Sequence, residues 1–393
     1  MKKKGVQHKE HSTARPAAAR DGSRLASLFD ARTVALVLAV KALLLMFAVE
    51  AFTVSQNERV GSLYDWLAIW NRWDAPHYLD LARGGYVSTG VEARWIVFYP
   101  LYPWLVRAAS FVLRDELLGA FFVSTVASLV AGVLLYRLAR LDEPEPVARA
   151  AVFFMFVFPT SYFLHIGYTE SLFLALAVGA FLAARMRRWW LAGLLGGLAA
   201  LTRVNGLLLL PALLFEARAE YAASGRERFP KGLSWLALIC AGFGVYLFIN
   251  WQVLGDPRAF LNAQSEFWYK QLTWPWVGIM EAWKSLRLRA PSDAQMVGGQ
   301  ELFFVLLGLG LTIWSWLRQR TSYAVWMTCN WLLWTSTKFV LSVPRYTLVL
   351  FPAYLLFARA ADSRPVLKAC ITVWSLLFLA LFAARFVQGY WAF

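Results

Sequence analysis

The chain has 393 residues, of which 59% are hydrophobic and 16% are charged, with a mean hydropathy of +0.50 and a formal net charge of +15. Soluble domains are about 45–50% apolar and about 25% charged, so this composition excludes an ordinary soluble domain and predicts an all-α polytopic membrane protein. The basic residues are spread between apolar runs, which argues against nucleic acid as a partner.

The chain begins with a basic segment, residues 1–32, that carries eight lysines and arginines. We expect a disordered cytoplasmic tail there. The next apolar run, 33–54, is longer than the core of a signal peptide and lacks a clean small-residue cleavage site, so it is predicted to be a retained first helix. Residues 33–393 are then expected to form a single transmembrane domain.

A spanning helix needs about 20 mostly apolar residues. Eleven segments are candidates: 33–54, 116–136, 149–166, 169–184, 189–202, 204–218, 232–251, 301–317, 322–338, 343–359 and 366–388. The pair 189–202 and 204–218 is short, so one tilted helix, and ten spans in all, is the alternative. With a cytoplasmic N-terminus, every predicted inner segment carries at least two lysines or arginines, which favours the hairpin and eleven spans.

This topology leaves two long loops outside, the first (55–115) and the fourth (252–300). Long loops on one side of a compact scaffold usually carry function. Residues 98–113 are apolar but contain Pro100 and Pro103, so we expect them to lie in the interface or to re-enter. The aromatic residues of 252–300 are typical of an interfacial belt, with sugar stacking as the alternative.

Polar residues gather on the predicted outer face, where ionisable groups at membrane depth are functional candidates. Asp74, beside Trp73, is the candidate general base, because partial desolvation would strengthen it. His77 lies three positions further on, on the same face of a helix. Alternatively, Asp74 is an N-cap, since Pro76 favours a first helical turn.

Glu170 and His165 are further candidate catalytic residues. Glu170 has a second interpretation as the first residue of a helix capped by Thr169, and His165 as a core histidine. Arg203 is the best candidate for binding an anion, because its planar guanidinium suits a phosphate and no acidic residue lies near it in sequence. Snorkelling to the interface is the alternative for Arg203, Lys338 and Arg345. The candidate residues for binding substrate and donor phosphate are Arg203, Asn205, Lys338, Arg345, Tyr346, Arg72, Trp73 and Tyr168.

Taken in order, these clusters resemble the glycosylphosphatidylinositol (GPI) mannosyltransferase II family, also called phosphatidylinositol-glycan class V, and its prokaryotic relatives. The matching pieces are Trp73-Asp74-Ala75-x-His77-Tyr78 with Gly85-Tyr86, Phe98-x-Pro100-Leu101-x-Pro103, Pro159-x-Ser161 through Tyr168-Thr169-Glu170-Ser171, Arg203-x-Asn205-Gly206 and, more weakly, Pro344-Arg345-Tyr346. Together they cover about 135 residues, from 73 to 206, with the last piece further on.

The resemblance implies a GT-C fold, with the active site beneath the first outer loop and Asp74 as the base. It also implies an inverting transfer of a sugar, mannose above all, from a polyprenyl-phosphate donor. The acceptor is then a glycolipid, a glycan or a protein, and the other partners are membrane lipids. Nothing in the sequence requires a cofactor or a metal; a metal held by Asp74 with Asp80 or Glu170 is the alternative. We expect a multi-pass protein of the cell (inner) membrane, or of the endoplasmic reticulum in a eukaryote, with its active site outside the cytoplasm.

Rival functions remain open from the sequence. A glucose or arabinose donor is the alternative within enzymes, and a lipid or sugar transporter is the alternative from another class. Transporters place polar groups near the midplane on broken helices of repeated halves. Here the polar groups share one face and no repeat is visible, which favours the enzyme.

Overall fold

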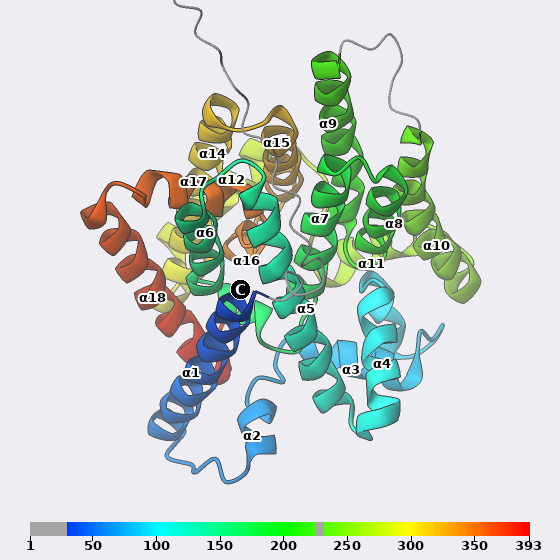
Figure 1. Ribbon diagram of the computed structural model, residues 1–393. Helices are drawn as coiled ribbons and strands as arrows, with labels where there is room; N and C mark the ends of the chain where they lie inside the picture. Colours follow the sequence, from blue (N-terminus) through cyan, green and yellow to red (C-terminus); the bar gives the residue numbers. More distant parts are fainter. Residues whose placement is uncertain (1–29, 225–231) are drawn as a thin grey trace, which may run out of the picture.

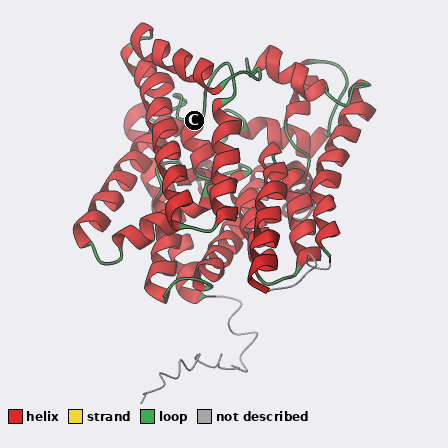
Figure 2. Ribbon diagram, turned by 90° about the horizontal axis from the view of Figure 1, so that it is seen from above, coloured by secondary structure: helices red, strands yellow, loops and turns green. Residues whose placement is uncertain are grey.

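The computed structural model describes residues 30–224 and 232–393, so most of the predicted basic tail lies outside the described residues. Within them the chain is helical, and the only strand-like pairing is an isolated antiparallel bridge between Leu272 and Thr337. Figure 2 shows helices joined by loops throughout. The all-α prediction is therefore confirmed for this part of the chain.

The helices follow in chain order (Figure 1). The first half contains α1 (Ala31–Gln56), α2 (Leu63–Ala68), α3 (Ala75–Gly84), the 3-10 helix η1 (Val91–Val97), α4 (Leu101–Leu113), α5 (Glu116–Arg140), α6 (Glu145–Val157), η2 (Ser161–Leu164), α7 (Glu170–Arg185), α8 (Trp189–Ala200), η3 (Val204–Leu208) and α9 (Leu209–Ser224). The second half contains η4 (Leu233–Leu236), α10 (Ala237–Leu254), α11 (Ala259–Phe267), α12 (Pro275–Leu288), α13 (Pro291–Asp293), the π-helical η5 (Ala294–Gln300), α14 (Glu301–Arg318), α15 (Thr321–Thr335), α16 (Val343–Thr347), α17 (Phe351–Ala361) and α18 (Pro365–Val387).

Five helical segments of the described chain are long and apolar enough to cross a bilayer: Ala31–Gln56, Glu116–Arg140, Leu233–Leu254, Pro291–Arg318 and Pro365–Val387. The pair η1 and α4 would be a sixth, but it bends by 114° at its break. Residues 91–113 therefore do not cross as one straight helix, and α4 alone has 13 residues, which agrees with the prediction that 98–113 is an interfacial or re-entrant segment.

The remaining predicted spans contain shorter helices. At a rise of 1.5 Å per residue, α7 is about 24 Å long, less than the roughly 30 Å of a hydrocarbon core. Nearly all of α7 is buried inside the protein, so it lies at the centre of the bundle. The number of eleven spans and the cytoplasmic N-terminus stay predictions.

Ion pairs gather the predicted inner segments at one end of the molecule. They join Arg185 to Asp142 (2.7 Å), Arg185 to Glu216 (3.4 Å), Arg320 to Glu216 (2.6 Å) and Arg359 to Glu143. In Figure 1 the end of α9 and the turn from α14 to α15 lie at the top, whereas α2, α3 and α4 lie at the bottom. The first predicted outer loop therefore lies opposite these segments.

Residues 189–218 form a helical hairpin. Arg185 and Glu216 meet at one end, whereas Arg203, at the turn between α8 and α9, contacts Thr169 at the far end of α7. The chain therefore runs to the far end along α8 and comes back along α9, which excludes a single tilted helix. The hairpin packs against α10 at glycine: a Cβ on Gly242 would lie 2.1 Å from the carbonyl oxygen of Gly197.

Candidate active site

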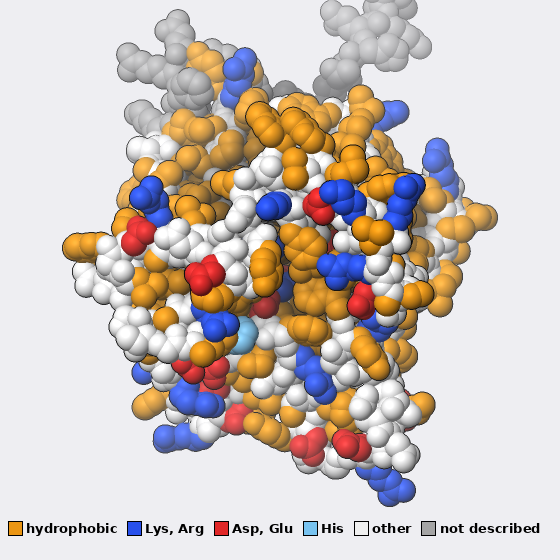
Figure 3. Space-filling view, turned by 180° about the vertical axis from the view of Figure 1, so that it is seen from behind, with side chains coloured by type: hydrophobic (Ala, Val, Ile, Leu, Met, Phe, Trp, Pro, Cys, Tyr) orange, Lys and Arg blue, Asp and Glu red, His pale blue; other side chains and the backbone are white. Residues whose placement is uncertain are grey.

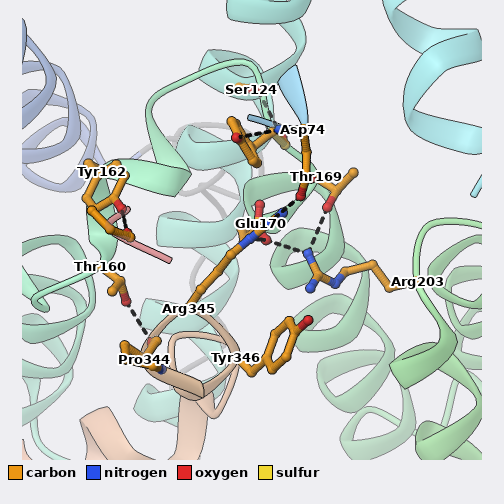
Figure 4. A network of polar contacts seen from close by, with 12 residues as sticks. Asp74, Ser124, Thr160, Tyr162, Thr169, Glu170, Arg203, Pro344, Arg345 and Tyr346 are labelled. Atoms are coloured by element: carbon orange, nitrogen blue, oxygen red, sulfur yellow. Dashed lines mark hydrogen bonds and ion pairs between the residues drawn. The ribbon is translucent and has the colours of Figure 1, made fainter. Parts of the chain in front are cut away.

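Arg345 is the centre of a buried charged cluster formed by segments far apart in the sequence (Figure 4). Its Nη1 donates to Oδ2 of Asp74 at 2.7 Å, and its Nε donates to Oε1 of Glu170. The guanidinium also lies 4.7 Å from the ring centroids of both Phe163 and Tyr168. A buried charge is tolerated when it is paired in this way, and cation–π contacts add to the pairing. Two carboxylates therefore fix the orientation of Arg345.

Asp74 stands at the N-cap position of α3, as one interpretation of the sequence predicted, but its side chain makes no capping hydrogen bond. Oδ2 instead accepts from Arg345, while Oδ1 accepts no hydrogen bond from the described residues. The backbone N–H of Asp74 donates to Oη of Tyr168 at 3.2 Å, and that hydroxyl donates to the carbonyl of Arg72 at 2.7 Å. With its side chain 27% exposed, Asp74 has one oxygen held and one oxygen open.

Glu170 is the first residue of α7 and is fully buried. Its Oε1 accepts from both Arg345 and Arg203, and Oε2 has no partner in the described part of the chain. Thr169 occupies the N-cap position without capping, because its hydroxyl instead accepts from Nη1 of Arg203 at 2.8 Å. Glu170 therefore bridges Arg345 and Arg203 and orients both guanidinium groups.

Glu301, which the sequence did not single out, fixes the start of the helix that carries Arg345. Its two carboxylate oxygens accept from the backbone N–H groups of Ser342 (2.7 Å) and Val343 (2.8 Å). Ser342 has a left-handed φ of 71°, a conformation that costs free energy for a residue other than glycine. No short motif marks this contact, because 41 residues separate Glu301 from Ser342.

The two histidine candidates lie outside the cluster. His77, in α3, stacks on Trp95 with ring centroids 3.7 Å apart and makes no ion pair with Asp74. Burial lowers the pKa of His77 below its usual value, although Asp74 and Asp80 oppose this shift. His165 is fully buried, its ring nitrogens have no partner in the described chain, and its carbonyl accepts from Lys41 at 2.8 Å. The structure therefore does not join either histidine to the carboxylate cluster.

The candidate binding residues divide into two groups. Tyr346 lies beside Arg203, whose guanidinium is 5.7 Å from its ring centroid. Asn205 instead pairs with Asn330 at 2.6 Å, and the side chain of Arg72 donates to the carbonyl of Ile69. The side chains of Asn205 and Arg72 therefore have structural partners away from the cluster. The cluster members are instead Arg203 and Asp74, each two residues away in the sequence.

Lys338 lines a separate hollow, and Trp73 packs against another of its lining residues. A cavity of about 620 Å³ is lined by Ser265, Tyr269, Gln271, Glu281, Arg289, Asp293, Val297, Lys338, Phe339, Leu341 and Trp391. Trp73, which is exposed, packs edge-on against Trp391 at 5.1 Å. None of Asp74, Glu170, Arg203 and Arg345 lines this cavity. Figure 3 shows one hollowed face with acidic and basic side chains around it.

No group of three or more His, Cys, Asp or Glu side chains is placed to hold a metal ion within residues 30–224 and 232–393. The expectation that no metal is required stays a prediction. What the cluster offers chemically is one open carboxylate oxygen beside two guanidinium groups, an arrangement suited to proton acceptance next to a bound anion.

Comparison with known proteins shows what this helical bundle is similar to. Residues 99–251 match the sequence model of the dolichyl-phosphate-mannose-protein mannosyltransferase family. The chain is 33% identical over 166 residues to GPI alpha-1,6-mannosyltransferase 2 of Mus musculus, covering 39% of this chain and 33% of that protein. It is 32% identical over 143 residues to GPI mannosyltransferase 2 of Schizosaccharomyces pombe, covering 35% and 30%.

Over this part of its length the chain is thus similar in sequence to GPI mannosyltransferases 2, and the resemblance seen in the motifs is confirmed. It covers about a third of the length of these relatives.

Among solved structures, the oligosaccharyltransferase of Archaeoglobus fulgidus matches with a TM-score of 0.47 at 14% identity, over 89% of this chain and 53% of that one. ArnT of Cupriavidus metallidurans, bound to undecaprenyl phosphate, matches with a TM-score of 0.45 at 12% identity, over 91% and 77%.

Proposed function

We propose that this protein is an inverting glycosyltransferase that moves mannose from a polyprenyl-phosphate donor to a hydroxyl group of a glycolipid, glycan or protein acceptor. The reaction takes place on the extracytoplasmic face of the cell membrane, or on the lumenal face of the endoplasmic reticulum in a eukaryote. The observation that carries the proposal is the open Oδ1 of Asp74 beside Arg345, with Arg203 joined to Arg345 through Glu170, which both arginines share. Homology to GPI mannosyltransferases supports mannose as the sugar.

Asp74 accepts the proton in this scheme. The acceptor hydroxyl attacks the anomeric carbon of the donor, the bond from that carbon to the phosphate oxygen breaks, and the proton passes to Oδ1. Polyprenyl phosphate leaves with the bonding electron pair, and the anomeric configuration inverts. The contact of Oδ2 with Arg345 supports this role, because it orients the carboxylate and leaves the other oxygen open.

Arg203 binds the departing phosphate. Its Nη1 is held by Thr169 and Glu170, but its Nε and Nη2 donate to no acceptor in the described part of the chain. A guanidinium with two free donors on one edge suits a phosphate. Holding the developing charge of the leaving group is usually the largest catalytic contribution. Arg345, whose Nε and Nη1 are both occupied, is assigned to orienting Asp74.

The test is direct transfer by the purified protein. Undecaprenyl phosphates carrying radiolabelled mannose, glucose or arabinose are supplied separately with a membrane extract as the acceptor source. We expect label from the mannose donor in an extractable product, with the opposite anomeric configuration to the donor by linkage-specific glycosidase digestion. If only the glucose or the arabinose donor gave labelled product, the donor sugar would be that sugar and not mannose. If none of the three donors gave labelled product, the proposed function would be contradicted.

A further inference from the structure

A lysine from the predicted fourth outer loop, 252–300, reaches the cluster, although nothing in its local sequence marks it. Nζ of Lys270 donates to Oη of Tyr346 at 2.5 Å and lies 4.6 Å from the centroid of the same ring. Arg203 lies over that ring as well, at 5.7 Å. Tyr346 therefore separates two cations that come from different parts of the fold, and Figure 4 shows it beside Arg203.

Backbone hydrogen bonds hold the residues directly after Lys270 in place. The N–H of Lys338 donates to the carbonyl of Gln271 at 2.8 Å, and the N–H of Thr273 donates to that of Ser336 at 3.0 Å, around the bridge between Leu272 and Thr337. These bonds tie the loop to the segment that leads into α16. A lysine held in this way loses less conformational freedom when it binds a ligand.

The three cations near Tyr346 differ in how they are paired, and Lys270 acts on the carboxylate of Glu301 only through space. Asp74 and Glu170 pair with Arg345 and Arg203, whereas Lys270 makes no ion pair with a described carboxylate. Glu301, the other buried carboxylate near by, uses both oxygens on backbone N–H groups. Three cations thus share two carboxylates in direct contact, and the partner of Lys270 is a neutral hydroxyl. An anion is the ligand that would complete this set.

We propose that Lys270 is a second ligand for the donor phosphate, together with Arg203, and that Tyr346 holds its ammonium when the donor is absent. This inference rests on the proposed function. On donor binding the ammonium transfers its hydrogen bond from the phenol oxygen to a phosphate oxygen. The fourth outer loop thereby contributes a residue to the site, whereas sequence reasoning placed the binding residues elsewhere.

The test compares Lys270→Gln, Lys270→Arg and Tyr346→Phe in the full-length protein. The probe is unlabelled undecaprenyl phosphate as a competitor of transfer, with uncharged undecaprenol alongside. A charge-assisted hydrogen bond of this kind corresponds to about 10–100-fold in affinity. We expect Lys270→Gln to weaken inhibition by undecaprenyl phosphate and to raise the donor KM by about that factor, with undecaprenol unaffected. Lys270→Arg should restore part of the loss.

Tyr346→Phe separates this role from a structural one. It removes the resting partner of the ammonium but leaves the charge, so phosphate affinity should stay the same or increase. If the lysine–tyrosine bond were only structural, Lys270→Gln and Tyr346→Phe would lower the Tm alike and leave the donor KM unchanged. Lys284→Gln is the matched control, because Lys284 is an exposed lysine of the same loop that pairs with Glu281.

The outcomes distinguish this inference from the function on which it rests. If undecaprenyl phosphate does not inhibit the wild-type protein, the proposed donor is wrong. If it does inhibit, and Arg203→Ala weakens it while Lys270→Gln does not, then Lys270 is not a phosphate ligand and the proposed function still stands.

Discussion

Replacing Asp74 by asparagine tests the central assignment, because the two side chains have nearly the same shape. Asparagine Oδ1 still accepts a hydrogen bond from Nη1 of Arg345, so the cost in stability is the difference between a charged and a neutral bond, about 1–2 kcal/mol. Loss of a general base costs about 10²–10⁴-fold in rate, which corresponds to roughly 3–5 kcal/mol of activation free energy. The effect on turnover should therefore exceed the effect on folding.

The assay measures transfer at saturating donor, together with the Tm of the purified variants in detergent and inhibition by undecaprenyl phosphate. Asp74→Asn should insert, should still bind the phosphate and should lose turnover; Asp74→Glu should also fail, because the longer side chain displaces the carboxylate. Asp80→Asn, an exposed carboxylate of the same helix, is the control. If Asp74→Asn kept more than about a tenth of wild-type turnover, Asp74 would not be the base, and Glu170, with its unpartnered Oε2, would become the candidate.

Three further predictions follow from the same geometry. Arg203→Ala should raise the donor KM by about 10-fold or more and Arg203→Lys should restore only part of it, since the fork is lost; unchanged donor kinetics would leave Arg203 a snorkelling residue. Because burial holds the pKa of His77 below its usual value, the unfolded chain binds a proton first as pH falls, so stability should decline below about pH 6.5. His77→Gln should remove that part of the decline in Tm measured from pH 8 to 5, and an identical slope in both proteins would show that His77 does not contribute. Tags inserted after Arg187 and after Ser224 should both be accessible from the cytoplasm, and an external position for the second would invert the C-terminal half.

The sequence alone was sufficient to predict an all-α polytopic membrane protein and the positions of most of its helices. Membrane helices are specified by local composition, so each predicted span contains a helix in the structure, with Pro100 and Pro103 lying where the chain bends. The motifs and their order were also enough to detect the resemblance to GPI mannosyltransferase II, because such a resemblance depends on residues in sequence and not on their contacts. Asp74, Glu170, Arg203 and Arg345 were each singled out by a local signal, a charge in an apolar stretch.

What each of these charges does was decided by the tertiary structure. Arg345 lies 271 residues from Asp74 and 175 from Glu170, and no local pattern states that one guanidinium will be shared between those two carboxylates. The same applies to Lys270 and Glu301, which look like ordinary loop and helix residues until packing places them against Tyr346 and the start of α16. His165, Asn205 and Arg72 looked equally polar in sequence, yet Asn205 and Arg72 have other side-chain partners, and the ring of His165 has none in the described chain. Composition selects which residues are costly to bury, but only the packing of the helices determines which of them meet.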